Sequence, residues 1–182
     1  MVFHATIYTW ATGLMQPGWV LDLGCEYGFG SLLIAETNPA LHVLGLDLNL
    51  EFLDYSVSLP SMERIPRLNA SGSHLPILSG SLSGVYLINL LHLVDDPSAM
   101  VAETWRTLKP GGAAILSIPM DASNQSKWDT PVLIKHLEDE LHYHFSHVNY
   151  PSKISGQLPS HSPKTFLLDQ PTSPWIAFVR KN

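Results

Sequence analysis

The stretch VLDLGCEYGFGSLL, residues 20–33, constrains the fold of this 182-residue chain most strongly, because an apolar run enters a glycine-rich loop and then a helical pattern. Residues 20–23 predict a strand buried on both faces of a parallel sheet, and residues 31–36 predict a helix. Asn38-Pro39 ends that helix, and residues 42–46 predict a second buried strand that finishes at Asp47. The pattern is one strand, helix, strand unit.

The same alternation continues along the chain. Further strands are predicted at residues 65–68, 85–90 and 113–118, with helices after Asn49, after Asp96-Pro97 and over residues 131–141. Because parallel neighbours need crossover connections, this order predicts an α/β fold with a doubly wound, mostly parallel, Rossmann-like sheet of about seven strands. Residues 145–150 and 175–179 predict a C-terminal antiparallel strand pair, joined by a long Pro- and Ser-rich connection without periodicity.

Length and composition favour a single domain over residues 1–182, in which a short N-terminal lid helix (1–18) precedes a core (19–119) and a final helix with the strand pair (120–182). The net charge of -6 and the scattered Lys and Arg residues argue against a nucleic-acid partner. Cys25 is the only cysteine, which favours a reducing compartment, and no apolar run approaches the ~20 residues of a membrane span. We therefore expect a cytoplasmic protein; a homo-oligomer is left open.

The residues that follow the first two strands predict a cofactor site. In an open parallel sheet, ligands bind at the carboxyl ends of the strands, near the point where the strand order reverses. Gly24 and Gly28 permit a tight turn and close approach of the backbone to a ligand. Asp47 is suited to accept hydrogen bonds from both hydroxyls of a ribose. The alternative is a solvated aspartate that caps the next helix.

The glycine spacing argues against a dinucleotide site. A G-x-G-x-x-G fingerprint that starts at Gly24 would need glycine in place of Glu26 and Phe29. Glycines at 24, 28 and 30 do fit the G-x-x-x-G-x-G loop of short-chain dehydrogenases. That family also needs a Tyr-x-x-x-Lys pair, and no tyrosine in this chain has a lysine four residues on.

Four motifs in order resemble the class I S-adenosylmethionine-dependent methyltransferases: VLDLGCEYGFG, GLDLN, the segment from NASGSHLP to LHLVDDP, and WRTLKPGG. The resemblance covers residues 20–119 and is strongest to the small-molecule branch of ubiquinone-biosynthesis-like enzymes (methyltransferase type 11) and glycan-modifying enzymes. It implies methyl transfer from S-adenosyl-L-methionine, with S-adenosyl-L-homocysteine as product, to a small molecule such as a lipid, quinone or glycan precursor. The alternatives are an inactive methyltransferase-like regulatory or scaffolding protein and, more distantly, a short-chain dehydrogenase.

The resemblance also implies which residues hold the cofactor. Around its methionine part it places the loop residues Asp22, Gly24, Cys25, Glu26 and Gly28. The residues assigned to the ribose and adenine are Asp47, Leu48, Asn69 and Ala70, with the backbone of Leu87 and Ile88 lining the same pocket. Tyr8, in the N-terminal helix, resembles an aromatic residue that closes over the amino acid end of the cofactor.

Three residues depart from the family pattern, which has glycine at Glu26, an acid at Asn69 and an aspartate at Ser83. The amide oxygen of Asn69 can still accept a hydrogen bond from an adenine amino group. A positive φ at Glu26 would cost on the order of 1 kcal/mol, which is small against a cofactor's binding energy. The direction of the Glu26 side chain therefore matters more: an outward side chain is harmless, whereas an inward one would meet the cofactor's carboxylate.

The residues that carry out the chemistry are harder to predict, because the cofactor itself brings the activated methyl group. His92 matches a histidine of the family's L-H-x-L segment and is a candidate general base, with a structural histidine as the alternative. The candidates for substrate contact are Trp10, Met120, Asp121 and Trp128. The histidines at 136, 142, 144, 147 and 161 have no zinc-type spacing, so no metal is expected.

Overall fold

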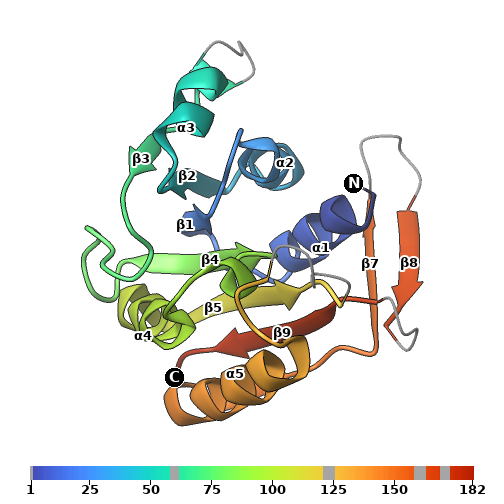
Figure 1. Cartoon of the computed structure of the whole chain (residues 1–182). Helices are drawn as coiled ribbons and strands as arrows, with labels where there is room; N and C mark the ends of the chain where they lie inside the picture. Colours follow the sequence, from blue (N-terminus) through green and yellow to red (C-terminus); the bar gives the residue numbers. More distant parts are fainter. Residues whose placement is uncertain (1, 58–61, 121–125, 158–162, 169–172) are drawn as a thin grey trace.

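A seven-stranded sheet forms the centre of the molecule, with the strand order β3-β2-β1-β4-β5-β9-β6 (Figure 1). The computed structural model describes residues 2–57, 62–120, 126–157, 163–168 and 173–182. The strands of the sheet are β1 (Gly18–Leu23), β2 (Leu41–Asp47), β3 (Arg67–Asn69), β4 (Leu82–Ile88), β5 (Leu108–Ile118), β6 (His147–Asn149) and β9 (Trp175–Arg180).

The strand directions confirm the predicted doubly wound topology. Strands β3, β2, β1, β4 and β5 run parallel to one another, whereas β9 lies antiparallel between β5 and β6. The order reverses between β1 and β4, which begin the two halves of the sheet. A ligand is therefore expected at the carboxyl ends of these two strands.

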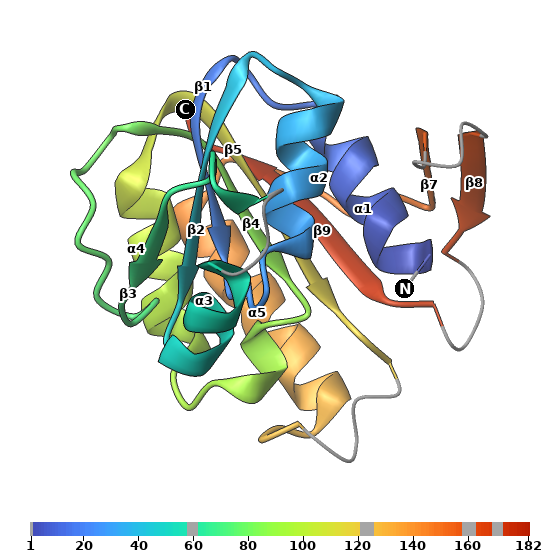
Figure 2. The same ribbon diagram turned by 90° about the horizontal axis from the view of Figure 1, so that it is seen from above.

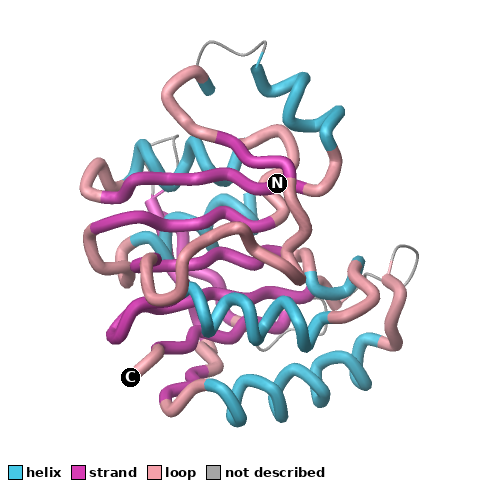
Figure 3. The backbone as a smooth tube through the Cα atoms, turned by 90° about the vertical axis from the view of Figure 1, so that its left-hand side faces the viewer, coloured by secondary structure: helices cyan, strands magenta, loops and turns pink. Residues whose placement is uncertain are grey.

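Helices cover both faces of the sheet (Figure 3). The helices are α1 (Val2–Thr12), α2 (Phe29–Thr37), α3 (Leu50–Val57), α4 (Pro97–Thr107) and α5 (Thr130–His144), with a 3₁₀ turn, η2, at Leu91–Leu93. Apolar side chains of α4 and α5 form one core with the sheet, and those of α1 and α2 form a second core on the opposite face. None of the described helices is both long and apolar enough to cross a membrane.

The connection between β6 and β9 differs from the expected structureless segment. It contains a separate antiparallel hairpin, made of β7 (Lys153–Gln157) and β8 (Pro163–Leu167). The hairpin lies beside α1 in both Figure 1 and Figure 2. Ile154 of β7 is buried in the same core as Ala5 and Ile7 of α1. The hairpin thus covers a helix that would otherwise expose an apolar face.

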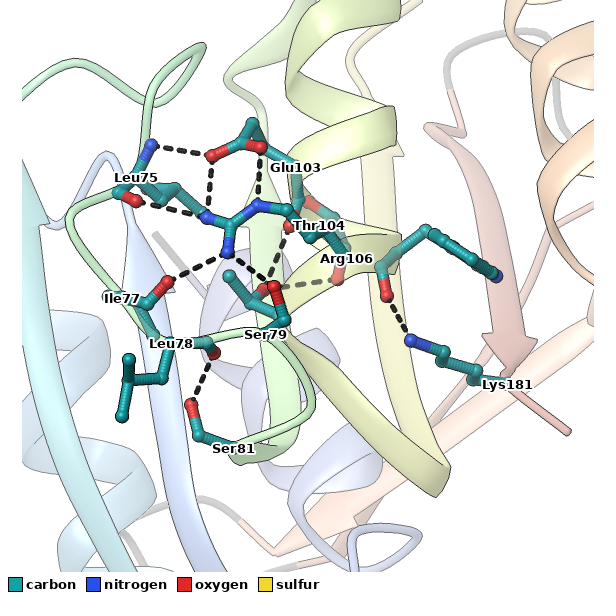
Figure 4. A network of polar contacts seen from close by, with 11 residues as sticks. Leu75, Ile77, Leu78, Ser79, Ser81, Glu103, Thr104, Arg106 and Lys181 are labelled. Carbon is teal, nitrogen blue, oxygen red and sulfur yellow. Dashed lines mark hydrogen bonds and ion pairs between the residues drawn. The ribbon is translucent and has the colours of Figure 1, made fainter.

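A charged clamp holds the loop that leads from β3 to β4 (Figure 4). The Arg106 guanidinium of α4 donates to both carboxylate oxygens of Glu103, over 2.6 and 2.8 Å. It also donates to the carbonyls of Leu75 and Ile77 and to the hydroxyl of Ser79. The backbone amide of Leu75 in turn donates to Glu103 Oε2. A planar guanidinium can satisfy several acceptors at once, so this one side chain fixes the course of the loop.

Candidate cofactor site

The loop between β1 and α2 turns sharply at two glycines. Gly24 has a φ of 77° and Gly28 a φ of 84°, conformations that favour residues without a Cβ atom. A Cβ atom at Gly28 would lie 2.0 Å from the terminal methyl of Met62, so a larger residue would have to displace that flexible side chain. The turn brings the first residues of α2 to the carboxyl end of β1, as the sequence predicts.

Glu26 lies in the same turn and adopts the left-handed conformation, with a φ of 48°. This conformation directs its backbone amide toward Asp47 at the end of β2, where it donates to Oδ2 over 2.9 Å. The other carboxylate oxygen of Asp47 accepts from the amide of Asn49 over 2.8 Å. A carboxylate has about four lone-pair sites, so Asp47 keeps acceptor capacity for ligand hydroxyls.

Asp22 is fully buried at the end of β1 and is held by two hydroxyl groups. Tyr8 of α1 donates to Oδ1 over 2.9 Å, and Ser31 of α2 donates to Oδ2 over 2.6 Å. Burial raises the pKa of Asp22 to about 6, although both hydrogen bonds act in the opposite direction. Asp22 thus joins α1, β1 and α2, and the Tyr8 ring forms part of the wall of the site.

Asn69, at the end of β3, binds the backbone of the strand beside it. Its side-chain nitrogen donates to the carbonyls of Asp47 and Leu48, over 3.0 and 2.9 Å. Only the nitrogen can serve these two acceptors, so the orientation of the amide is determined and its oxygen remains able to accept. A carboxylate at this position would place negative oxygens against both carbonyls.

A polar chain closes the site at the end of β4. Asn89 has a φ of 53°, and its side-chain nitrogen lies 2.6 Å from Nε2 of His4 in α1. Its side-chain oxygen accepts from the Ser117 hydroxyl over 2.9 Å, which leaves the amide nitrogen to face the imidazole. Burial lowers the pKa of His4, so the neutral ring accepts this hydrogen bond.

These elements enclose a cavity of about 280 Å³. Its predicted lining residues are Tyr8, Gly24, Cys25, Glu26, Asp47 and Ile88. The others, which sequence reasoning did not assign to the site, are His4, Tyr27, Phe29, Gly30, Phe52, Asn89, Leu90 and Leu93. The Tyr27 ring contacts Phe52 and Tyr55 of α3, with ring centroids 4.7 and 5.4 Å apart. Aromatic side chains therefore flank the cavity on the α3 side.

The remaining predicted cofactor residues lie around this cavity rather than in its described wall. Asp22 and Gly28 support the loop from behind, and Asn69 and Ala70 join β3 to β2. The Leu87 side chain is buried in the core on the α4 and α5 face, while Leu48 is 73% exposed. Side chains alternate along a strand, so Ile88 can face the cavity only if Leu87 faces away from it.

His92 does not line the cavity. It lies in η2 with its side chain buried, and burial lowers its pKa. Its Nδ1 atom has no hydrogen-bond partner among the described residues. Its backbone carbonyl accepts from the amide of Lys127 over 2.9 Å, which ties η2 to the segment before α5. The geometry gives His92 a place in packing, and its role as a base stays a prediction.

The other histidines and aromatic candidates make separate contacts. His136 lies 2.7 Å from the Ser98 hydroxyl and stacks on Trp128, and His144 pairs with Glu140 at 3.6 Å. No three described His, Cys, Asp or Glu residues form a group that could hold a metal ion.

Trp10 packs on Phe178. Neither Trp10, Met120 nor Trp128 lines the cavity, and Asp121 and His161 lie outside the described residues.

The site fits the group that its residues suggest. Its volume approaches the range of about 300–1,000 Å³ that is typical of ligand pockets, and a carboxylate with spare acceptor capacity stands at one side. A glycine turn and the first residues of α2 form the adjoining wall. Glu26 is itself exposed and lines this space without closing it. Together the fold and the site define a doubly wound α/β protein of the kind that binds a nucleoside-containing cofactor.

Comparisons with known proteins place the chain in a family. Residues 21–116, more than half of the chain, match the family described as "Methyltransferase domain". An uncharacterized chloroplastic methyltransferase of Arabidopsis thaliana is 31% identical over 105 residues, which cover 54% of this chain and 30% of that protein. Trans-aconitate 2-methyltransferase of Deinococcus radiodurans is 28% identical over 122 residues, which cover 67% of this chain and 46% of that protein.

Solved structures share the fold. The YcgJ protein of Bacillus subtilis superimposes with a TM-score of 0.73 at 13% identity, over 98% of both chains. The chain thus belongs to the class I S-adenosylmethionine-dependent methyltransferases, as the sequence motifs indicate. It spans less than half the length of the two curated relatives that are named above.

Proposed function

We propose that this protein binds S-adenosyl-L-methionine in the cavity at the ends of β1, β2 and β4 and transfers its methyl group to a small-molecule acceptor. The observation that carries the proposal is the Asp47 carboxylate, which lines the cavity and keeps free acceptor capacity beside the glycine turn. The acceptor classes that we favour are lipid, quinone and glycan precursors, which suit the aromatic side chains near the cavity.

Each part of the cofactor has suitable residues. Asp47 would accept hydrogen bonds from the ribose hydroxyls, and the oxygen of Asn69 would accept from the adenine amino group. Gly24, Glu26 and the first turn of α2 would surround the amino acid end, with the Tyr8 ring beside them. When bound, the cofactor supplies an activated methyl group, and the protein has to position the acceptor atom and exclude water.

The chain of Ser117, Asn89 and His4 is our candidate for the acceptor side of the site. Asn89 and His4 line the cavity, and their hydrogen bond leaves the other imidazole nitrogen, Nδ1, free to carry the proton. In the neutral tautomer that this hydrogen bond fixes, Nδ1–H would donate to the oxygen of a hydroxyl acceptor and so orient it, whereas Nε2 is already occupied by Asn89. His4 therefore suits this role better than His92, whose side chain is buried outside the cavity. Replacing His92 by Ala and finding turnover unchanged would remove it from the mechanism.

Calorimetric titration with S-adenosyl-L-homocysteine tests the cofactor assignment. A charge-assisted hydrogen bond contributes about 1.5–3 kcal/mol, so Asp47→Ala should weaken binding by more than tenfold. Asp54→Asn, which changes an exposed acid on α3, is the matched control and should leave binding intact. If the wild-type protein binds neither the product nor S-adenosyl-L-methionine, the transferase proposal is wrong and a scaffolding role becomes the better explanation.

We also propose that the segments 1–18, 19–119 and 120–182 form one domain. Support comes from the core beside α1, which combines Ile7 of the first segment, Ile34 of the second and Ile176 of the third. The last strand, β9, pairs with β5 of the middle segment along six residue pairs. Limited proteolysis should therefore release no stable fragment that ends near residue 119.

A further inference from the structure

The described wall of the cavity has an unusual charge balance for a site that takes an amino acid. Two of its side chains, Glu26 and Asp47, are acids, and none is lysine or arginine. The single basic candidate is His4, whose pKa is lowered by burial. A carboxylate that enters the cavity therefore finds no cationic side chain among the described lining residues.

Glu26 stands where the amino acid end of the cofactor is expected. Its backbone is fixed by the 2.9 Å hydrogen bond to Asp47, so its side chain starts from a defined position at the cavity wall. Burial, and after it the nearby charge of Asp47, raise the pKa of Glu26, as expected for two acids that line the same cavity. A cation bound between them would relieve the repulsion between their charges.

Among the described lining residues, those in the first turn of α2 offer the favourable feature for a carboxylate. The N-terminus of a helix is equivalent to about half a positive charge. An ionised Glu26 carries a full negative charge in the same wall, so the balance at the amino acid end favours an ammonium group and disfavours a carboxylate.

We propose that Glu26 makes this cavity selective for adenosyl sulfoniums that carry an ammonium group and no carboxylate, the chemistry of decarboxylated S-adenosylmethionine. This inference rests on the proposed cofactor site and concerns binding at its amino acid end. S-Adenosylmethionine keeps both groups, so the attraction of its ammonium is opposed by the repulsion of its carboxylate. S-Adenosylhomocysteine also keeps both groups but lacks the sulfonium charge, so it serves as the reference with a neutral sulfur.

Calorimetric titration of the wild-type protein, Glu26→Gln and Glu26→Gly with these three compounds tests the proposal. The wild type should bind the decarboxylated sulfonium at least about tenfold more tightly than S-adenosylmethionine, the effect of one opposed charge pair in a partly solvated site. Both variants should lose this preference, mainly by binding S-adenosylmethionine more tightly. Glu51→Gln, on the exposed first turn of α3, is the matched control and should keep it.

The outcomes separate this inference from the function on which it rests. If S-adenosylmethionine binds and its affinity relative to the decarboxylated compound is the same in wild type and Glu26→Gln, the selectivity proposal is overturned while the cofactor site stands. If none of the three compounds binds to any variant, the cofactor site itself is wrong. Binding of both sulfoniums to the wild type, with a preference for the decarboxylated compound that both variants lose, supports both.

Discussion

The backbone amide of Glu26 lies 2.9 Å from Oδ2 of Asp47, so the residue that departs from the family's glycine also orients the acid that we propose for the ribose. The contact depends on the left-handed conformation of Glu26, whose φ is 48°. Backbone and side chain therefore act differently at this position. The backbone supports Asp47, whereas the carboxylate places a second negative charge in the same cavity.

Replacing Glu26 by Gly should leave the protein as stable as the wild type or stabilise it by up to about 1.5 kcal/mol. Glycine relieves a left-handed strain of roughly 1–2 kcal/mol and loses about 0.5–1 kcal/mol through its greater freedom when unfolded. Chemical denaturation measures the difference. Glu51→Gly, in the regular helix α3, should instead destabilise by about 1 kcal/mol. Equal losses in the two variants would contradict the strain at Glu26.

Replacing Asp22 by Asn should remove a pH-dependent loss of stability. Burial raises the pKa of Asp22 from 3.8 to about 6, so between these pH values the unfolded chain releases the proton while the folded one keeps it. Stability from this group therefore falls as the pH rises from about 4 to 6 and stays level above, a loss on the order of 3 kcal/mol. Asn can still accept from Tyr8, and the Ser31 hydroxyl can rotate to accept.

Urea unfolding of wild type and Asp22→Asn at about pH 4 and pH 7 checks this. The free energy of unfolding of the variant, relative to that of the wild type, should be higher at about pH 7 than at about pH 4. Parallel stability curves would show that Asp22 titrates normally. Tyr8→Phe serves as a second comparison, since it removes one hydrogen bond to the carboxylate and should push the pKa of Asp22 higher still.

Replacing Arg106 by Lys should destabilise the protein by about 2 kcal/mol, because an ammonium group cannot serve Glu103 and the loop carbonyls of Leu75 and Ile77 together. The urea midpoint should fall with an unchanged slope. Lys135→Gln, which removes an exposed ion pair on α5, is the control and should shift the midpoint little. If Arg106→Lys unfolds at the same urea midpoint as the wild type, the loop keeps its conformation without the Arg106 hydrogen bonds.

Replacing Asn89 by Asp should raise the pKa of His4. The substitution keeps the shape of the side chain and tolerates a positive φ, but places a carboxylate about 2.6 Å from the imidazole. The His4 ring signals in an NMR titration should then change at a higher pH than in the wild type. The ring signals of His142, an exposed residue of α5, should be the same in both proteins. If the His4 ring signals change at the same pH in both proteins, the hydrogen bond to residue 89 does not form in solution.

The sequence predicted the parts of the site that lie at the ends of buried strands. An apolar run that stops at glycines or at an acid marks where a strand reaches the carboxyl edge of the sheet, which is why the sequence places the glycine loop and Asp47 at one edge, where the structure has them side by side. Asn89 carries the same signal, a polar residue directly after β4, and was missed because the predicted strand ran on to Leu90.

Other residues depend on contacts that no local pattern reveals. His4 and Tyr8 are four residues apart and so share a face of α1, but which element that face meets is decided by packing. The β7–β8 hairpin has short strands beside a Pro- and Ser-rich stretch, so its alternation is too brief to detect. Its stability comes from α1, against which Ile154 is buried. The 3₁₀ turn likewise directs His92 inward, although the chain position alone suggested the ligand edge.

The place of α1 between the hairpin and α2 bears on how a ligand enters. Moving this helix outward would break the Tyr8 bond to Asp22 and uncover Ile154, so α1 cannot act as an easily opened gate. Tyr27, Phe29 and Leu93 line the cavity and are exposed to solvent. A ligand that enters past these side chains requires no helix to move. Association in a stopped-flow experiment should therefore accelerate in proportion to ligand concentration without reaching a plateau, because no slow conformational step precedes entry.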